Sequence, residues 1–429
     1  MDWRTYYRDH LTTAEEAVQR IQSGNRVIIG HACTDPGVLV DAMVANADAY
    51  RDVEIFHMLP MGKAPYTAPG MEPHFRHISG FAGGSTRKAI AEGRADLAPV
   101  FFSRYPDYVR NQVQPDVAMI HVSTPDEHGY CSYSLAVDYT KAGAESAKVV
   151  LAQVNPQMPR ILGDSAIHVT EMDAIIEVDY PIVELPPPVI SEVEAKIGAN
   201  CASLVKDGDT LQLGIGAIPD AVLAELGDFN DLGIHSEMFS DGVVDLIEKG
   251  VVNNQRKTIH RGQSVYTFLM GTRKLYDYVH DNPAVWGGPV DYVNNPLIIA
   301  QNDNLVSINS CIQVDLQGQV VSSSVGLRQI SGIGGQADFI RGAAMSKGGR
   351  SILAFPSTAK GGQASKVVPF IDQGAAVSTS REDVQYIVTE YGIADLKGQP
   401  LKERAKRLIA IAHPNFRDEL TAEAQRRYG

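Results

Sequence analysis

IQSGNRVIIGHACTDPGVL (21–39) and VKDGDTLQLGIGAIPDAV (205–222) are two versions of one sequence pattern. Each has an apolar residue, a glycine three positions later, a short apolar run ending in glycine, and then a proline. This order is typical of a β-strand that passes through a glycine turn into a helix. With one extra residue in the first copy, the matched pairs are Gly24 with Gly208, Val27 with Leu211, Gly30 with Gly214, and Pro36 with Pro219.

A second pair of segments matches at nearly the same offset. MIHVSTPDEHGYCS (119–132) aligns with INSCIQVDLQGQVVSS (308–323). Two matches at similar offsets indicate that one unit occurs twice, so we expect a duplicated α/β domain. The matched residues here are Asp126 with Asp315 and Gly129 with Gly318.

The proline-rich stretch ELPPPVIS (184–191) lies between the two copies and is typical of an extended linker. We therefore expect one domain over residues 1–188 and a second over residues 189–429. Unbroken apolar runs such as RVIIG, VAMIHV, TLQLG and SILAF alternate with helical patterns. That alternation predicts an α/β fold with mostly parallel sheets covered by helices.

Composition narrows the class of protein. The chain has 429 residues and a net charge of -13, which counts against a nucleic-acid binder. Its N-terminus is polar, and no apolar run approaches the roughly 20 residues that span a bilayer. We expect a soluble cytoplasmic enzyme that does not bind membranes. Reduced core thiols are expected at Cys33, Cys131, Cys201 and Cys311 because these residues are far apart and form no CxxC pair.

Common cofactor signatures are missing from the sequence. There is no GxxxxGK[ST] phosphate loop, no GxGxxG and no HExxH, and the twelve histidines do not cluster at metal-ligand spacing. These observations predict that the chain has no metal site and no classical dinucleotide site.

The segment LGIGAIPDAV (213–222) predicts a strand, a glycine turn and a helix opened by Pro219. Its glycines let the backbone approach a ligand, and free N–H groups at a helix start favour an anion. A simple tight turn would need the same residues, so both interpretations remain open.

The segment GIHSEMFSDGVVDLIEKG (233–250) predicts a second strand end leading into a helix that Ser240 or Asp241 could cap. Glu237 precedes the cap, so it is not needed to cap or extend the predicted helix. It is either an ordinary loop carboxylate or a catalytic group at a strand end, where α/β enzymes hold their ligands.

Two further glycine-rich segments follow apolar runs. They are SGIGGQADFIRGA (331–343) and AFPSTAKGGQASK (354–366), and the second offers Lys360 and Lys366 as cations. It also contains the tetrad STAK, which fits the SxxK pattern of Ser–Lys acyl enzymes. Neither SDN nor KTG follows it, so Ser357 is a poor candidate nucleophile.

Four motifs occur in order: LGIGAIPDAV, HSEMFSDG, GIGGQADFIRGA and VTEYGIADLKG (388–398). Together they resemble the acetyl-CoA hydrolase/transferase family of class I CoA transferases, and among its members those acting on 4-hydroxybutyrate and butyrate. The resemblance covers essentially the whole chain. It implies two similar open α/β domains, a CoA thioester as substrate, short-chain carboxylates as partners, no tightly bound cofactor, and a homodimer.

The resemblance also implies roles for single residues. Glu237 matches the nucleophile that forms a glutamyl-CoA thioester, and Gly335 matches a glycine of the acyl pocket and oxyanion hole. Ile312 and Lys360 fall where family members touch CoA. Relatives often have a larger Val or Leu where this chain has Ala337. The glycine turn matches a segment that holds CoA and places the Ile215 N–H in the oxyanion hole; its residues are Gly214, Ile215, Gly216, Ala217 and Ile218.

Other functions remain open at this stage. An acyl-CoA hydrolase would use the same thioester with water, and a catalytically silent CoA-binding protein would not need Glu237. A nucleotide-linked oxidoreductase is disfavoured because no fingerprint follows any strand. The stretch from Met58 to Tyr66, with His31 and Gln212, is a hypothesis for the acid pocket, and the acids themselves are not identified.

Overall fold

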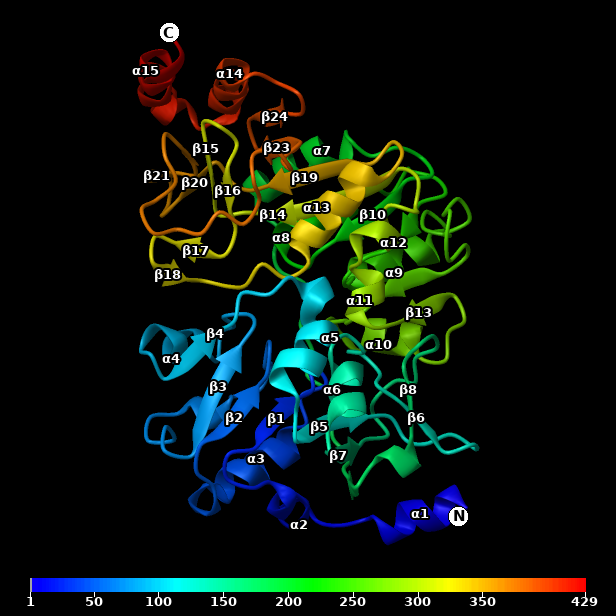
Figure 1. Ribbon diagram of the computed structural model, residues 1–429. Helices are drawn as coiled ribbons and strands as arrows, with labels where there is room; N and C mark the ends of the chain where they lie inside the picture. Colours follow the sequence, from blue (N-terminus) through cyan, green and yellow to red (C-terminus); the bar gives the residue numbers. More distant parts are fainter. Residues whose placement is uncertain (1) are drawn as a thin grey trace. The chain divides into compact units, whose positions relative to one another are not determined.

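The structure is a computed structural model that describes residues 2–429 (Figure 1). The chain forms two compact units. Unit 1 comprises the residues up to Leu185 together with Val265–Val293, and unit 2 comprises Pro186–Ser264 together with Asn294–Gly429. The first boundary lies within the predicted linker. The split expected at 188/189 does not hold for residues 265–293, which pack with the N-terminal unit instead.

Backbone pairing explains why this excursion joins unit 1. Strands β12 (Ser264–Tyr266) and β13 (Val285–Gly287) pair with each other. Isolated bridges then join Phe268 to Ala136 and Gly287 to Gly163. The two bridges link residues more than a hundred positions apart, and no local pattern in the sequence predicts them.

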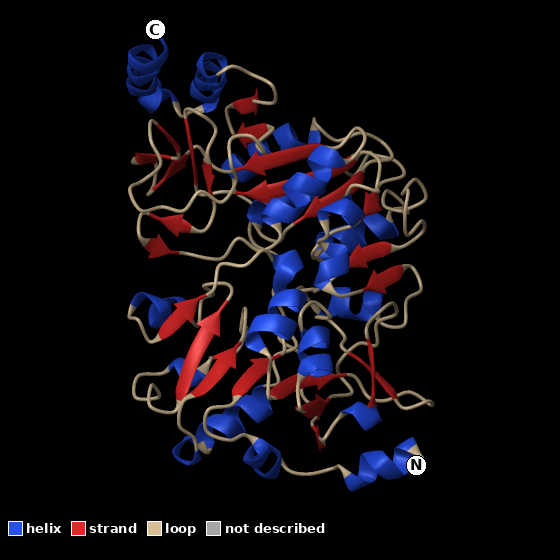
Figure 2. Cartoon of the chain, viewed as in Figure 1, coloured by secondary structure: helices blue, strands red, loops and turns tan. Residues whose placement is uncertain are grey.

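Unit 1 contains a seven-stranded parallel sheet in the order β4-β3-β2-β1-β5-β7-β9, shown among the red strands of Figure 2. All six residues of β5 are buried, as expected for a parallel strand with both faces covered. The strands are β1 (Arg26–Ile29), β2 (Val53–Phe56), β3 (Phe75–Ser79), β4 (Ala95–Leu97), β5 (Val117–Val122), β7 (Val149–Val154) and β9 (Ala174–Glu177).

Unit 2 contains a six-stranded sheet in the order β11-β10-β14-β19-β23-β24. Only β24 runs antiparallel to its neighbour, so the prediction of mostly parallel sheets is confirmed for both units. The strands are β10 (Thr210–Leu213), β11 (Gly233–Ile234), β14 (Leu305–Ser310), β19 (Arg350–Ala354), β23 (Tyr386–Thr389) and β24 (Gly392–Asp395).

Helices contact both sheets; α6 packs on β1 and β5, and α13 packs on β14 and β19. In unit 1 the α-helices are α1 (Trp3–Asp9), α2 (Ala14–Ala17), α3 (Gly37–Ala45), α4 (Arg87–Ala91), α5 (Tyr105–Tyr108), α6 (Thr140–Ser146), α10 (Arg273–Val279) and α11 (Val290–Val293). In unit 2 they are α7 (Glu192–Ala202), α8 (Ala217–Ala224), α9 (Asp241–Glu248), α12 (Pro296–Ile299), α13 (Gln336–Met345), α14 (Leu401–Ile411) and α15 (Arg417–Tyr428).

Shorter strands complete the units. They are β6 (Tyr130–Ser132), β8 (Ala166–His168), β15 (Gln313–Asp315), β16 (Val320–Val321), β17 (Ser324–Val325), β18 (Arg328–Gln329), β20 (Thr358–Ala359), β21 (Ala364–Ser365) and β22 (Val367–Val368). Within residues 2–429, no helix has the length and apolar character needed to cross a membrane. All four cysteines are free and buried, as predicted.

The two units repeat one strand order. In unit 1, Val27 of β1 pairs with strands β2 and β5; in unit 2, Leu211 of β10 pairs with β11 and β14. The sequence β2-β1-β5-β7-β9 therefore matches β11-β10-β14-β19-β23, strand for strand. This agreement supports the duplication that the sequence predicts.

The matched aspartate turns also agree in detail. The Asp126 carboxylate accepts the N–H groups of residues 128 and 130, and the Asp315 carboxylate accepts those of residues 317 and 319. Gly129 and Gly318 both have a φ of 89°, a left-handed conformation that favours glycine. The same aspartate turn thus follows β5 in unit 1 and, in unit 2, begins at the end of β15, the strand directly after β14.

Candidate functional site

Glu237 lies at the carboxyl end of β10, although β11 is the strand that precedes it. After β11 the chain turns back, and Met238 forms an antiparallel bridge with Leu213. The Ser236 hydroxyl donates to the Leu213 carbonyl at 3.0 Å and accepts from the Leu213 N–H at 3.3 Å. Because the residues on both sides of Glu237 are tied to β10, its backbone position is fixed.

The half-buried Glu237 carboxylate is held by residues from two other elements. The Asn294 side-chain amide donates to Oε2 of Glu237 at 2.7 Å. Gly335 lies so close that an added Cβ would overlap both this carboxylate and the Asn294 amide. Gly335 is also the N-cap of α13, and a helix N-terminus stabilises a negative charge. The arrangement orients an anionic Glu237 with a neutral donor and a helix dipole.

The predicted glycine turn begins next to the backbone of the Glu237 segment, since Leu213 pairs with Met238 and residues 214–216 follow Leu213 directly. Gly216 has a φ of 114°, which only glycine adopts readily, and it is the N-cap of α8. The helix begins at Ala217, so the expectation that Pro219 opens it is wrong by two residues. Ser240 is the N-cap of α9, but its hydroxyl donates to Asp220 at 3.0 Å instead of capping the helix.

Ile312 and Gly335 both lie near the carboxyl end of β14. The Gln336 side chain donates to the Ser310 carbonyl at the end of β14, which ties the start of α13 to the segment that carries Ile312. Ile312 itself is half-buried, and its N–H donates to the Val321 carbonyl. The structure therefore gathers Glu237, the turn from Gly214 to Ile218, Ile312 and Gly335 at the carboxyl ends of β10 and β14.

Lys360 is not in this cluster. It lies at the exposed tip of the β20–β21 hairpin, with a φ of 53°. Lys366 is half-buried, with its ammonium nitrogen 5.1 Å from the centre of the Phe355 ring, and burial lowers its pKa. The Ser357 hydroxyl is fully buried and donates to Glu390 at 2.6 Å.

Asn294 is a site residue that the sequence analysis missed. It is fully buried, and its side-chain oxygen Oδ1 has no hydrogen-bond partner in the described part of the chain. The surrounding sequence, DYVNNPL, resembles an ordinary turn before a proline. No local pattern distinguishes Asn294, because its contact with Glu237 joins residues 57 positions apart.

The residues suggested for the acid pocket fall in different units. His31 belongs to unit 1, where its ring nitrogen Nδ1 lies 2.6 Å from a carboxylate oxygen of buried Asp138. His57 pairs with the Tyr66 hydroxyl at 2.8 Å in the same unit. Gln212 belongs to unit 2, where its oxygen accepts hydrogen bonds from Ser307 and Asn309 within the sheet. The side-chain amide of Gln212 therefore forms hydrogen bonds with residues of the neighbouring strand β14.

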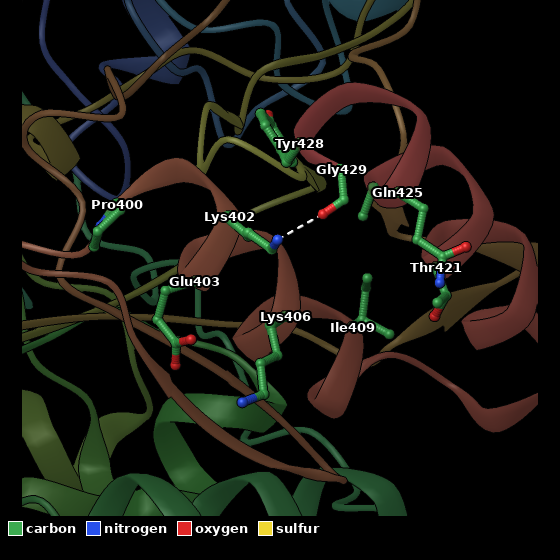
Figure 3. A pocket seen from close by; sticks show the side chains of 10 residues that line it. Pro400, Lys402, Glu403, Lys406, Ile409, Thr421, Gln425, Tyr428 and Gly429 are labelled. Carbon is green, nitrogen blue, oxygen red and sulfur yellow. Dashed lines mark hydrogen bonds between the residues drawn. The ribbon is translucent and has the colours of Figure 1, made fainter.

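A separate cavity of about 540 Å³ lies between α14 and α15 (Figure 3). Lys402 donates across one end of it to the Gly429 carbonyl at 2.5 Å. None of the predicted site residues lines this cavity. Its lining is mostly apolar and consists of Pro400, Lys402, Glu403, Lys406, Ile409, Thr421, Ala424, Gln425, Tyr428 and Gly429.

Comparison with known proteins decides the family. Residues 1–187 match the acetyl-CoA hydrolase/transferase N-terminal domain, and residues 271–424 match the C-terminal domain of the same family. The chain belongs to the acetyl-CoA hydrolase/transferase family. Residues 188–270, which include Glu237, lie between these two matched ranges and belong to neither.

Individual members of the family are similar over nearly the full length. A 4-hydroxybutyrate coenzyme A transferase of Clostridium kluyveri is 57% identical, with 100% of each chain covered. A butyryl-CoA:acetate CoA-transferase of Anaerostipes caccae is 38% identical, covering 99% of this chain and 98% of the relative. A solved 4-hydroxybutyrate CoA-transferase from Porphyromonas gingivalis is 45% identical with a TM-score of 0.87, covering 99% of this chain and 100% of that one.

Proposed function

We propose that this member of the family is an acyl-CoA:carboxylate CoA-transferase that exchanges CoA between short-chain acids, using 4-hydroxybutyrate or butyrate together with acetyl-CoA or acetate. Its full-length similarity to transferases that act on these acids supports the substrate class. The observation that carries the mechanism is the Glu237 carboxylate, held in one orientation by Asn294 against Gly335.

In the proposed reaction, Glu237 attacks the thioester carbonyl of the acyl-CoA. The C–S bond breaks, leaving a mixed anhydride and CoA thiolate. The thiolate then attacks the Glu237 carbonyl, which releases the first carboxylate and forms a glutamyl-CoA thioester. An incoming carboxylate reverses these steps. Covalent catalysis of this kind divides one difficult exchange into easier ones and gives ping-pong kinetics.

Each tetrahedral intermediate carries an oxyanion that needs donors. We assign this role to the backbone around Gly335, which is the N-cap of α13 and adjoins the Glu237 carboxylate, and to the N–H of Ile215, which directly precedes the N-cap of α8. One such donor is worth about 3–4 kcal/mol. The segment from Gly214 to Ile218, Ile312 and Lys360 would hold the CoA moiety away from the reacting carbon, where binding energy can be expressed in the transition state.

Trapping the intermediate tests the role of Glu237. Incubation with butyryl-CoA alone, followed by borohydride, should reduce a thioester at Glu237 to an alcohol that peptide mass spectrometry detects. Glu237→Ala should abolish both the trapped product and the transfer. Glu225→Gln, which changes an exposed carboxylate after α8, is the matched control and should keep full activity. Substantial transfer by Glu237→Ala would refute the assignment.

The same preparation separates the alternative functions. A hydrolase would release CoA thiol from acetyl-CoA without an acceptor acid, whereas a transferase would release little. A silent CoA-binding protein would bind CoA without either reaction. A panel of acceptors that includes acetate, butyrate and 4-hydroxybutyrate would identify the preferred acid, and sedimentation would test the proposed homodimer.

A further inference from the structure

The segment that presents Glu237 begins at an unusually short edge strand. Strand β11 has two residues, Gly233 and Ile234, and it lies at the edge of the unit 2 sheet. The N–H groups of Gly233 and His235 donate inward, to the carbonyls of Asp209, just before β10, and of Leu211 in β10. In a parallel strand the intervening residue points its N–H and C=O the opposite way, so both peptide groups of Ile234 face outward from the sheet.

Side chains satisfy these outward groups in place of another strand. The Asn254 side-chain oxygen accepts the Ile234 N–H at 2.8 Å. The Lys257 side-chain nitrogen donates to the Ile234 carbonyl at 2.7 Å and to the Gln263 carbonyl at 2.6 Å. The Lys257 stem also packs on Gly233, where an added Cβ would overlap it. The loop after α9 therefore holds the sheet edge at Ile234 through one amide and one amine. At Leu232, just before β11, it holds the edge through backbone hydrogen bonds with Val251, Asn253 and Asn254.

Lys257 has an unusual environment for a lysine. It is only 4% exposed, and its side-chain nitrogen is held by two backbone carbonyls. Burial lowers its pKa well below the usual value. A neutral amine has two N–H groups, which match the two carbonyls, whereas an ammonium group would leave a third donor buried. Half-buried His260 is a nearby titratable group, and burial lowers its pKa.

We propose that Lys257 is a positioning residue for Glu237: its amine anchors Ile234 and so fixes the start of the turn that presents the carboxylate three residues later. This inference rests on the proposed function. On the other side, Ser236 and Met238 bind the turn to β10. On the outer side, Asn254 and the backbone bonds of Leu232 share the attachment with Lys257. Lys257 is the donor to the Ile234 carbonyl, which would be buried without that donor if the amine were removed.

The test compares Lys257→Met with Lys249→Met. Methionine keeps the length and apolar stem of Lys257 but removes its donors, and Lys249 is an exposed lysine at the end of α9. In Lys257→Met, we expect kcat to fall about 10- to 100-fold while KM for acyl-CoA changes less than about twofold, because a displacement of about 1 Å has costs of this size. Lys249→Met should leave both unchanged.

Hydrogen exchange gives a second measurement that does not depend on activity. In Lys257→Met, exchange should rise in residues 232–240 and stay unchanged in β14 and β19. If this variant does not fold, Lys257→Gln, which keeps one donor, should show a smaller form of both effects. Unchanged exchange and kcat, or exchange that rises equally throughout unit 2, would overturn the positioning role. Full activity of Glu237→Ala would instead refute the proposed function, and the exchange result would stand.

Discussion

The space around Glu237 is set by a single glycine. The Gly335 Cα faces the carboxylate and the Asn294 amide, and there is no room for a side chain between them. A glycine at a helix N-cap is usually explained by backbone freedom, but Gly335 has a φ of -93°, which any residue can adopt. The close approach of Glu237, and not the backbone conformation, is therefore what requires glycine here.

We predict that Gly335→Ala lowers kcat by about 100-fold or more, because the methyl group would displace Glu237 from its orientation. The fold should persist, since the backbone conformation suits alanine. Gly227→Ala is the control, because a Cβ there meets open space. Steady-state kinetics and thermal unfolding of both variants provide the measurement; wild-type kcat in Gly335→Ala would contradict the site as described.

In unit 1, a carboxyl group with a displaced pKa provides a pH test. Burial raises the pKa of Asp35 to about 7, and its Oδ1 has no hydrogen-bond partner in the described residues. A raised carboxyl pKa means that the protonated form favours folding. Its stabilising contribution is complete below about pH 4 and is lost as the pH rises through 7.

Asp35→Asn should therefore gain stability relative to the wild type as the pH rises from 4 to 7, by about 2–4 kcal/mol at pH 8. Both tryptophans, Trp3 and Trp286, belong to unit 1, so urea unfolding followed by their fluorescence reports on this unit. Asp48→Asn, which changes an exposed carboxylate of unit 1, is the control. A difference that does not change with pH would show that Asp35 titrates normally.

At the scale of elements, the site is a set of strand ends linked by side chains. β10 and β14 are neighbours in the sheet, and their carboxyl ends carry the glycine turn and Ile312. Gln336 ties α13 to β14, and Ser236 ties the Glu237 turn to β10. The β20–β21 hairpin follows β19, the next strand of the same sheet, and carries Lys360 on its exposed tip.

If the hairpin holds a CoA phosphate, Lys360→Ala should raise KM for acyl-CoA roughly tenfold and leave KM for the acceptor acid nearly unchanged. The effect should shrink at high salt, because ions screen an exposed charge. Lys397→Ala, at another exposed turn, should have no effect. If only Lys366→Ala raises KM for acyl-CoA, then Lys366, and not Lys360, binds the CoA moiety.

At the scale of the whole molecule, the two units share one strand order but carry different residues at the ends of the matched strands. The matched strand orders and aspartate turns are shared, but Glu237, Asn294 and Gly335 all belong to unit 2. The duplication therefore preserves the scaffold, and the second copy alone carries the proposed nucleophile.

The duplicated turns predict independent effects on stability. Asp126→Ala and Asp315→Ala each remove a carboxylate that accepts two backbone N–H groups, so each should destabilise its own unit by about 1–3 kcal/mol. Tryptophan fluorescence should report the loss in Asp126→Ala, and far-ultraviolet circular dichroism should report both. The double variant should be additive if the units unfold independently; Asp228→Ala, an exposed site, is the control.

The sequence by itself determined the repeated units, the parallel sheets, the glycine turns and the position of Glu237 at a strand end. The patterns that predict these features lie within short stretches of the chain. Apolar runs form strands, glycines adopt positive φ values, and helices begin where their caps allow. The errors at this level were small, such as α8 beginning two residues before Pro219.

Only the tertiary structure decided which distant residues meet. The excursion over residues 265–293 joins unit 1 through long-range strand pairing, Asn294 reaches Glu237 across 57 positions, and Lys257 closes the edge of β11. None of these contacts has a local signature. The reason is physical: a hydrogen bond between distant residues forms only after the sheet has brought them together, so its partners look like ordinary loop residues in the sequence.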